Sequence, residues 1–169
     1  NDVAGSPTKE IKRSTDFAAP QVSGAAALVL HAFPYLTGEQ VKQVLLGTAT
    51  DIGAPGVDDV FGWGRLDASK AVKGPANLAW GDMQLRLSNG LNGGWAGALR
   101  NDISGDGGPT IDAGGRSALM YMTGHNTYKG PTRLWSDISL VVFDYLQSEV
   151  QLGSGSHLTA AVGAGLASY

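Results

Sequence analysis

The chain has 169 residues, of which 43% are apolar, enough for one domain or two small ones with a core, so a wholly disordered chain is excluded. The formal net charge is −3 and no basic block occurs, which argues against nucleic acid and anionic membrane surfaces as partners. Cysteine is absent, so disulfides and cysteine-based metal sites are excluded. No apolar run reaches the ~18–20 residues of a membrane-spanning helix.

The first residue is Asn1, and the chain's three methionines are Met83, Met120 and Met122. We therefore expect the chain to be a fragment or a processed product. Any secretion signal would then lie upstream of Asn1.

Residues before about 74 have helical patterns. The run Ala18–Ala32 is rich in Ala, Val and Leu on every side, which predicts a helix buried on all faces. Phe33-Pro34 ends this helix, because proline disfavours helical geometry in the residue before it. Thr37 and Gln40 form a capping-box pattern that predicts a second helix. Its apolar stripe has helical spacing and consists of Val41, Val44 and Leu45.

The next part of the chain alternates loop and short elements. The stretch 51–60 contains Gly53, Pro55 and Gly56 and is expected to be a loop. The sequence Phe61-Gly-Trp-Gly suits a brief strand or turn, followed by a short helix over Asp67–Val72. Gly74-Pro75 then marks a change in composition.

Beyond residue 75 the chain consists of short alternating runs separated by Gly, Asn and Asp, which predict short strands joined by turns: Met83–Leu87, Leu119–Met122 and Ile138–Val142. Evenly spaced short strands favour a solenoid. The residues from Glu149 to Leu152 and from His157 to Tyr169 are expected to add further strands. The final run also resembles an outer-membrane barrel strand, but one strand cannot close a barrel, so we interpret it as another coil.

One segment carries a family resemblance. It reads Ser14-Thr15-Asp16-Phe17-Ala18-Ala19-Pro20-Gln21-Val22-Ser23-Gly24. It resembles the nucleophile segment of subtilases, Gly-Thr-Ser-(Phe/Met)-Ala-(Ala/Ser/Thr)-Pro-x-Val-(Ser/Ala/Thr)-Gly, with a match from Phe17 through Gly24. Further on, Phe61-Gly-Trp-Gly-Arg-Leu-Asp-Ala resembles that family's closing motif. The resemblance covers residues 14–73 and implies the C-terminal helices of a subtilisin-like serine peptidase.

Three departures from the family pattern bear on activity. Asp16 stands at the position of the nucleophilic serine, Ser14 replaces a glycine, and the residues from Thr8 to Arg13 do not resemble the usual lead-in. An ionised carboxylate has no proton for a histidine to remove, so Asp16 cannot give the acyl transfer of an activated serine. Aspartate is a preferred helix N-cap, and we expect Asp16 to cap the helix at an inactive nucleophile position. Ser14 and Thr15 lie one or two residues from the correct place, and catalytic geometry does not tolerate that displacement.

The other catalytic residues of the family are missing as well. Subtilases place their Asp and His before the serine, but only fifteen residues precede Asp16 and they contain Asp2 and no His. The oxyanion-hole Asn would also lie upstream. His31 is expected about 22 Å along the helix from Asp16, and the remaining two histidines, His125 and His157, are expected on the surface. No two histidines have metal-ligand spacing, so we expect neither a metal site nor a cofactor.

The second half carries its own resemblance. It contains Arg100-Asn101-Asp102-Ile103-Ser104-Gly105-Asp106-Gly107-Gly108, then Gly124-His125-Asn126-Thr127-Tyr128-Lys129-Gly130-Pro131-Thr132. This is similar to the passenger repeat of bacterial autotransporters and implies a β-helical stem. The strand between the two parts is apolar on both faces, and periodicity leaves open which face is buried: Ala118, Met120 and Met122, or Leu119 and Tyr121. Calcium is a weaker alternative, because the acidic residues follow neither nine-residue-repeat nor EF-hand spacing.

Together the two resemblances imply an α/β remnant, the C-terminal helices of a subtilisin-like fold, followed by a Gly-rich, all-β, partial right-handed parallel β-helix. The expected division is residues 1–74 for the peptidase portion and 75–169 for the stem. The parent would be an autotransporter serine endopeptidase at the surface of a Gram-negative bacterium or outside it. Its expected partners are polypeptide substrates, an upstream protease half with Asp and His, and a downstream membrane β-barrel. The alternative is a non-catalytic stem or display segment.

Overall fold

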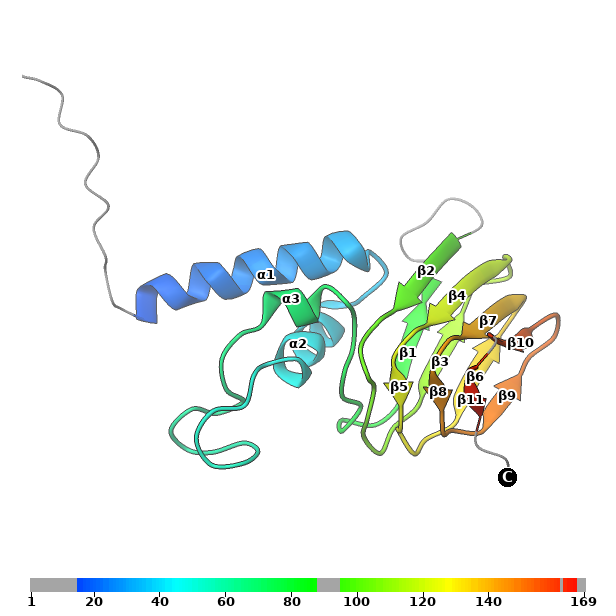
Figure 1. Ribbon diagram of the computed structural model, residues 1–169. Helices are drawn as coiled ribbons and strands as arrows, with labels where there is room; N and C mark the ends of the chain where they lie inside the picture. The colour runs from blue at the N-terminus through cyan, green and yellow to red at the C-terminus, as the bar shows by residue number, and fades with distance from the viewer. Residues whose placement is uncertain (1–14, 88–94, 162, 167–169) are drawn as a thin grey trace, which may run out of the picture.

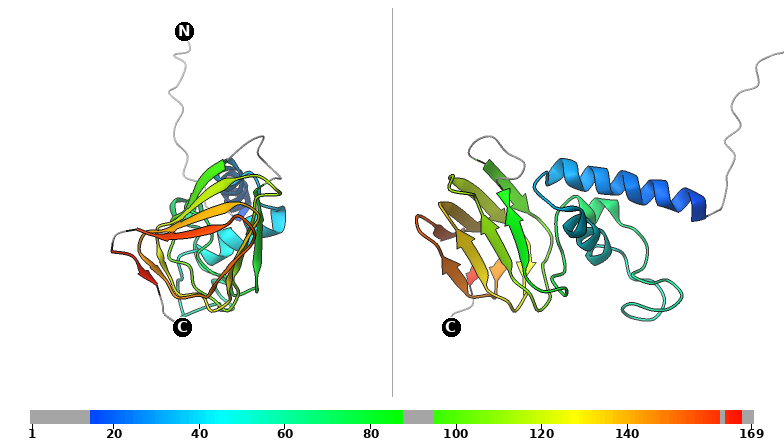
Figure 2. Two further views of the ribbon diagram at one scale, coloured as in Figure 1. Left: turned by 90° about the vertical axis from the view of Figure 1, so that its right-hand side faces the viewer. Right: turned by 180° about the vertical axis from the view of Figure 1, so that it is seen from behind.

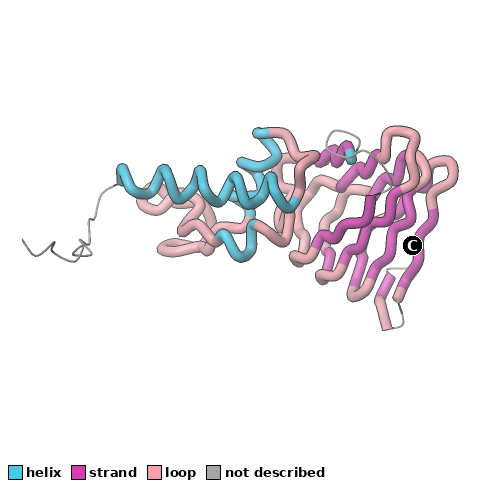
Figure 3. Tube along the Cα trace, turned by 90° about the horizontal axis from the view of Figure 1, so that it is seen from above, coloured by secondary structure: helices cyan, strands magenta, loops and turns pink. Residues whose placement is uncertain are grey.

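The computed structural model describes residues 15–87, 95–161 and 163–166. In this part of the chain, a helical segment is followed by a short parallel β-helix. The longest helix extends away from one end of the β-helix (Figure 1, and from behind in Figure 2). Seen from above, the strands lie side by side in successive coils while this helix continues beyond them (Figure 3). The expected order of helices and then β-helix is confirmed.

The helical segment begins with a short 3-10 turn, η1 (Thr15–Phe17), and continues as α1 (Ala18–Ala32), α2 (Gly38–Gly47) and α3 (Ala68–Ala71). The predicted capping box at the start of α2 is confirmed, because the Thr37 hydroxyl accepts the Gln40 N–H while the Gln40 side chain accepts the Thr37 N–H. The predicted apolar stripe of α2 is buried.

Two aspartates stabilise the loop between α2 and α3: Asp58 lies within the loop, and Asp67 lies where the loop meets α3. The Asp58 carboxylate accepts backbone N–H groups of Phe61, Val60 and Ala54, and these hydrogen bonds hold its pKa below the usual value. Asp67 caps α3 by accepting the Lys70 N–H. The expected strand or turn at residues 61–64 is a turn, closed by an antiparallel bridge between Asp58 and Gly62.

Three parallel sheets form the sides of the β-helix, and each takes one strand from a coil. The first sheet contains β1 (Met83–Arg86), β3 (Pro109–Asp112), β6 (Thr132–Trp135) and β9 (Val150–Leu152). The second contains β2 (Trp95–Leu99), β4 (Ala118–Met122), β7 (Ile138–Val142) and β10 (His157–Ala160). The third contains β5 (His125–Asn126), β8 (Tyr145–Leu146) and β11 (Gly165–Leu166). Four strands in a sheet correspond to four coils, and the end-on view in Figure 2 shows the coils behind one another.

The register explains the autotransporter-type motif. Trp95 pairs with Ala118 and Thr110 pairs with Arg133, so both pairs are separated by 23 residues (118 − 95 and 133 − 110). The two halves of the motif therefore stack directly on each other. Backbone N–H groups of Thr123, Thr127 and Lys129 donate to the carbonyls of Leu99, Ile103 and Gly105. The motif is thus the corner of one coil lying against the corner of the previous one.

The interior of the β-helix contains the face of β4 that sequence periodicity left undecided. Ala118, Met120 and Met122 are buried, and in register with them lie the buried residues Ile138, Leu140 and Val142 of β7. Stacking of like apolar residues on neighbouring coils removes them from water, which no single coil could do.

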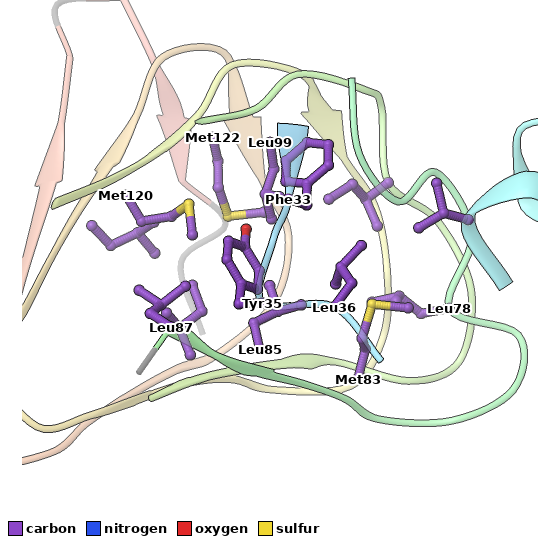
Figure 4. Close-up of a cluster of buried hydrophobic side chains, with 14 of the residues drawn as sticks. Phe33, Tyr35, Leu36, Leu78, Met83, Leu85, Leu87, Leu99, Met120 and Met122 are labelled. Atoms are coloured by element: carbon purple, nitrogen blue, oxygen red, sulfur yellow. The ribbon is translucent and has the colours of Figure 1, made fainter. Parts of the chain in front are cut away.

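The first coil is covered by the connection between α1 and α2. Phe33, Tyr35 and Leu36 are 4%, 2% and 6% exposed. Figure 4 shows the Tyr35 ring among the side chains of the β-helix, and its buried neighbours there are Leu85, Leu87, Met120 and Met122. Burial raises the pKa of Tyr35, because the phenolate would lose its hydration. We call Phe33, Tyr35 and Leu36 the end plug.

Two hydrogen-bonded links hold the helical segment beside the plug. The Gln40 side chain donates its Nε2–H to the carbonyl of Gln84 in β1, at 2.5 Å. The buried Asn101 side chain donates to the carbonyls of Lys70 and Gly74, at 3.0 and 2.7 Å. The helices and the first coil therefore share one hydrophobic core and a set of hydrogen bonds.

Replacing Tyr35 by Ala should destabilise the whole described chain. Removing a fully buried aromatic ring costs about 3 kcal/mol or more of unfolding free energy. Urea unfolding followed by far-UV circular dichroism measures the loss. The matched control is Phe61→Ala, whose ring is 50% exposed and should cost less than about 1 kcal/mol. Equal losses for the two variants would contradict the plug.

Replacing Gly124 by Ala should also destabilise the β-helix. A Cβ at this position would lie 2.1 Å from the carbonyl oxygen of Asn101 on the preceding coil, so the coils would have to separate. We expect a loss of about 2 kcal/mol or more in the same urea experiment. Gly38→Ala serves as the control, because a Cβ there meets nothing within 4 Å. A Gly124→Ala variant as stable as this control would show that the coils do not approach as described.

Candidate functional site

The segment that resembles a nucleophile motif lies at the N-terminal end of α1, the end that is far from the β-helix (Figure 1). Helix α1 begins at Ala18 with Phe17 in the N-cap position, and Pro20 lies in the first turn, where a missing N–H is tolerated. Asp16 therefore lies one residue before the N-cap, inside the 3-10 turn. The expectation that Asp16 is the N-cap is wrong, because the chain enters α1 through an additional tight turn.

The motif has no enclosed surroundings in the described chain. All residues from Asp16 to Gly24 are exposed, including the large side chains of Phe17 (47%) and Val22 (44%). Ser14 lies outside the described residues, as does the side chain of Thr15. What this end of α1 offers chemically is a helix N-terminus, with free N–H groups and a positive dipole end that stabilise negative charge.

No histidine of the chain is placed as a base for Asp16. His31 is in the last turn of α1, at the opposite end of the helix. His125 belongs to β5, where its ring stacks on Tyr145 at 4.6 Å and its Nδ1 lies 3.6 Å from the Asp144 carboxylate. His157 is in β10. A serine-type mechanism needs a base within hydrogen-bond reach of the nucleophile, and this arrangement does not supply one.

Helix α1 is not buried on all faces. Only Ala25 and Val29 are buried on it, against the rest of the helical segment. The large side chains of Val22, Leu28 and Leu30, and of Phe17 at the N-cap, remain exposed. The expectation of all-round burial is wrong for this chain. No described element covers the outer side of α1. We call these four side chains the open face of α1.

None of the helices in the described residues combines the length and apolar character that crossing a bilayer requires. Within the same residues, no three His, Asp or Glu side chains are grouped so that they could hold a metal ion.

The sequence comparisons agree with the two-part architecture. Residues 6–64 match the model of the subtilase family. The Neisserial autotransporter lipoprotein NalP of Neisseria meningitidis is 42% identical over 138 residues, which cover 82% of this chain and 12% of that protein. An extracellular serine protease of Serratia marcescens is 34% identical over 152 residues, covering 72% of this chain and 14% of its own. The serotype-specific antigen 1 of Mannheimia haemolytica is 47% identical over 71 residues, which are 42% of this chain and 7% of that protein.

These matches place the chain in a family. Its helical part belongs to the subtilase family, and the resemblance to subtilases of the autotransporter type is confirmed. The chain spans only about an eighth of the length of the first relatives.

Sequence reasoning missed the end plug. Phe33 and Pro34 indicated only the end of a helix, although three of the four residues from Phe33 to Leu36 are apolar and buried. That density of apolar residues in a four-residue connection was the available signal. The partners of these residues in the β-helix and before it, such as Gly74 and Leu85, lie about 40 residues or more along the chain, where local patterns give no information.

The open face of α1 should bind a hydrophobic dye. Large apolar side chains that remain exposed on a folded chain bind anilinonaphthalene sulfonate. We expect dye fluorescence with the native chain, and a clear decrease in a Phe17→Gln, Leu28→Gln double variant. Lys42→Gln, on the exposed side of α2, is the control and should leave the signal unchanged. A native chain with a sharp cooperative melt and no dye fluorescence would contradict this account.

Proposed function

We propose that the chain is the junction segment of a secreted serine endopeptidase, with residues 1–74 belonging to the peptidase domain and 75–169 to its β-helical stem. The observation that carries this proposal is the similarity to NalP, which extends over 82% of the chain and so spans the helical segment and the β-helix together. The relatives are described as an autotransporter lipoprotein and an extracellular protease. We therefore assign the parent to the bacterial surface or the exterior, with polypeptides as substrates.

The chain itself is proposed to be catalytically incomplete. Asp16 occupies the nucleophile position, it is exposed, and no histidine of the chain lies near it. The upstream protease half would have to supply the missing Asp and His, together with a sheet that covers the open face of α1. A membrane β-barrel would follow downstream.

A second function is favoured by one observation, the end plug. Because Phe33, Tyr35 and Leu36 close the first coil, the helical segment has a structural use that does not depend on catalysis. A non-catalytic stem or display segment would keep such a closure and lose the nucleophile. The two functions differ in the upstream sequence of the parent: intact Asp and His motifs favour the peptidase, and their absence favours the stem.

Restoring the serine should not restore activity. An Asp16→Ser variant still lacks its base, and a triad without its partners loses most of its rate. We expect casein hydrolysis equal to that of the unmodified chain, and no labelling of either protein by a fluorophosphonate probe. An active subtilisin serves as the positive control in both assays.

Two results would contradict catalytic incompleteness. One is casein hydrolysis by the Asp16→Ser variant above the background of the unmodified chain. The other is fluorophosphonate labelling of the unmodified chain that a Ser14→Ala substitution abolishes.

A further inference from the structure

The outer face of the first sheet carries a shallow hollow that the peptidase resemblance does not explain. Alternate residues of this sheet point outward, and the register sets their neighbours. Thr110 pairs with Gln84 on one side and with Arg133 on the other, and Asp112 pairs with Trp135. The hollow has a volume of about 350 Å³ and is lined by Asp82, Gln84, Thr110, Arg133 and Trp135. A second hollow of about 240 Å³ adjoins it through Gln84 and reaches Gln40 and Thr37 of the helical segment.

The polar groups of the hollow are held in place. The Asp82 carboxylate accepts the backbone N–H of Gly108 at 2.9 Å with one oxygen and the Arg133 guanidinium at 2.7 Å with the other. The Gly108 hydrogen bond is also the main reason why the pKa of Asp82 lies below its usual value, with Arg133 as a further cause. Arg133 uses one nitrogen for Asp82 and retains further N–H donors. Fixed side chains lose little entropy when a ligand binds.

Trp135 supplies an apolar surface beside these groups. It follows Arg133 by two residues, so both side chains lie on the same face of β6, and it is 48% exposed. An indole ring that is half exposed on a sheet offers a flat face to a ligand at small entropic cost, because the side chain has only two torsions. The neighbouring Gln84 is exposed, and its amide provides donors and an acceptor, whereas Thr110 is only 5% exposed.

We propose that this hollow binds a neutral oligosaccharide, with a pyranose ring lying on Trp135 and its hydroxyls bonded to Arg133 and Gln84. A pyranose combines an apolar C–H face with hydroxyls that both donate and accept, which matches the lining. The charges of Asp82 and Arg133 offset each other, so the hollow carries no excess charge for an anionic ligand. This binding function lies in the stem and goes beyond the proposed peptidase origin.

The ligand class can be tested with two defined probes, cellohexaose and maltohexaose. In an amide-labelled sample of the full chain, one of them should shift the backbone signals of Thr110 and Arg133 saturably, with a dissociation constant of about 1 mM, typical of weak ligands. Trp135→Ala should weaken binding about tenfold or more, and Trp135→Phe should retain part of it. Arg133→Gln should also weaken binding.

The matched control is Trp80→Ala, because Trp80 is a similarly exposed tryptophan (40%) that packs on Trp63 outside the hollow. This variant should bind the sugar as the unmodified chain does. The proposal is overturned if neither hexasaccharide shifts these signals saturably up to about 20 mM. It is equally overturned if Trp80→Ala and Trp135→Ala weaken binding alike, or if an anionic hexasaccharide, hexagalacturonic acid, binds in place of both neutral ones.

Discussion

Burial of the end plug is the interaction on which the described structure depends. A parallel β-helix has an apolar interior that is open at both ends, and an uncovered end exposes both apolar side chains and unpaired backbone groups. In this chain the Tyr35 ring, with Phe33 and Leu36, covers the interior of the first coil. The hydrogen bonds of Gln40 to Gln84 and of Asn101 to Lys70 and Gly74 fix the cover in place. The helical segment thus acts as the cap of the stem.

The two sides of the helical segment therefore differ in how far their apolar side chains are buried. Its side toward the β-helix is buried and hydrogen-bonded, whereas the outer side of α1 exposes large apolar side chains. Among the described residues, the β-helix therefore covers one side of the helical segment and no element covers the other. The connection after α1 closes the first coil, whereas Asp16 lies at the opposite end of α1 and takes no part in this closure.

Local features were predictable from the sequence. The limits of α1, the capping box of Thr37 and Gln40, and the strand Ile138–Val142 follow from periodicity and capping chemistry, which act over a few residues. Features that depend on residues distant in the sequence were not predictable. The buried face of β4 is decided by the coils on either side, and the place of Tyr35 by residues as far away as Met122. Asp16 was misplaced by one residue because the 3-10 turn before α1 leaves no pattern. The segment from Ser14 to Gly24 identified the family. A serine-type mechanism also needs a histidine, which this segment does not contain, and an aspartate that orients the histidine.

Native-state hydrogen exchange tests the capping account most directly. If the end plug joins the helical segment and the β-helix into one cooperative unit, the amides at the end of α2, such as Thr48, and those of β4, such as Met120, should exchange through the same opening, with the same free energy and the same denaturant dependence. An opening of α2 that occurs at clearly lower free energy than that of β4, with Met120 still protected, would contradict the account. It would show that the stem closes its first coil without the helices.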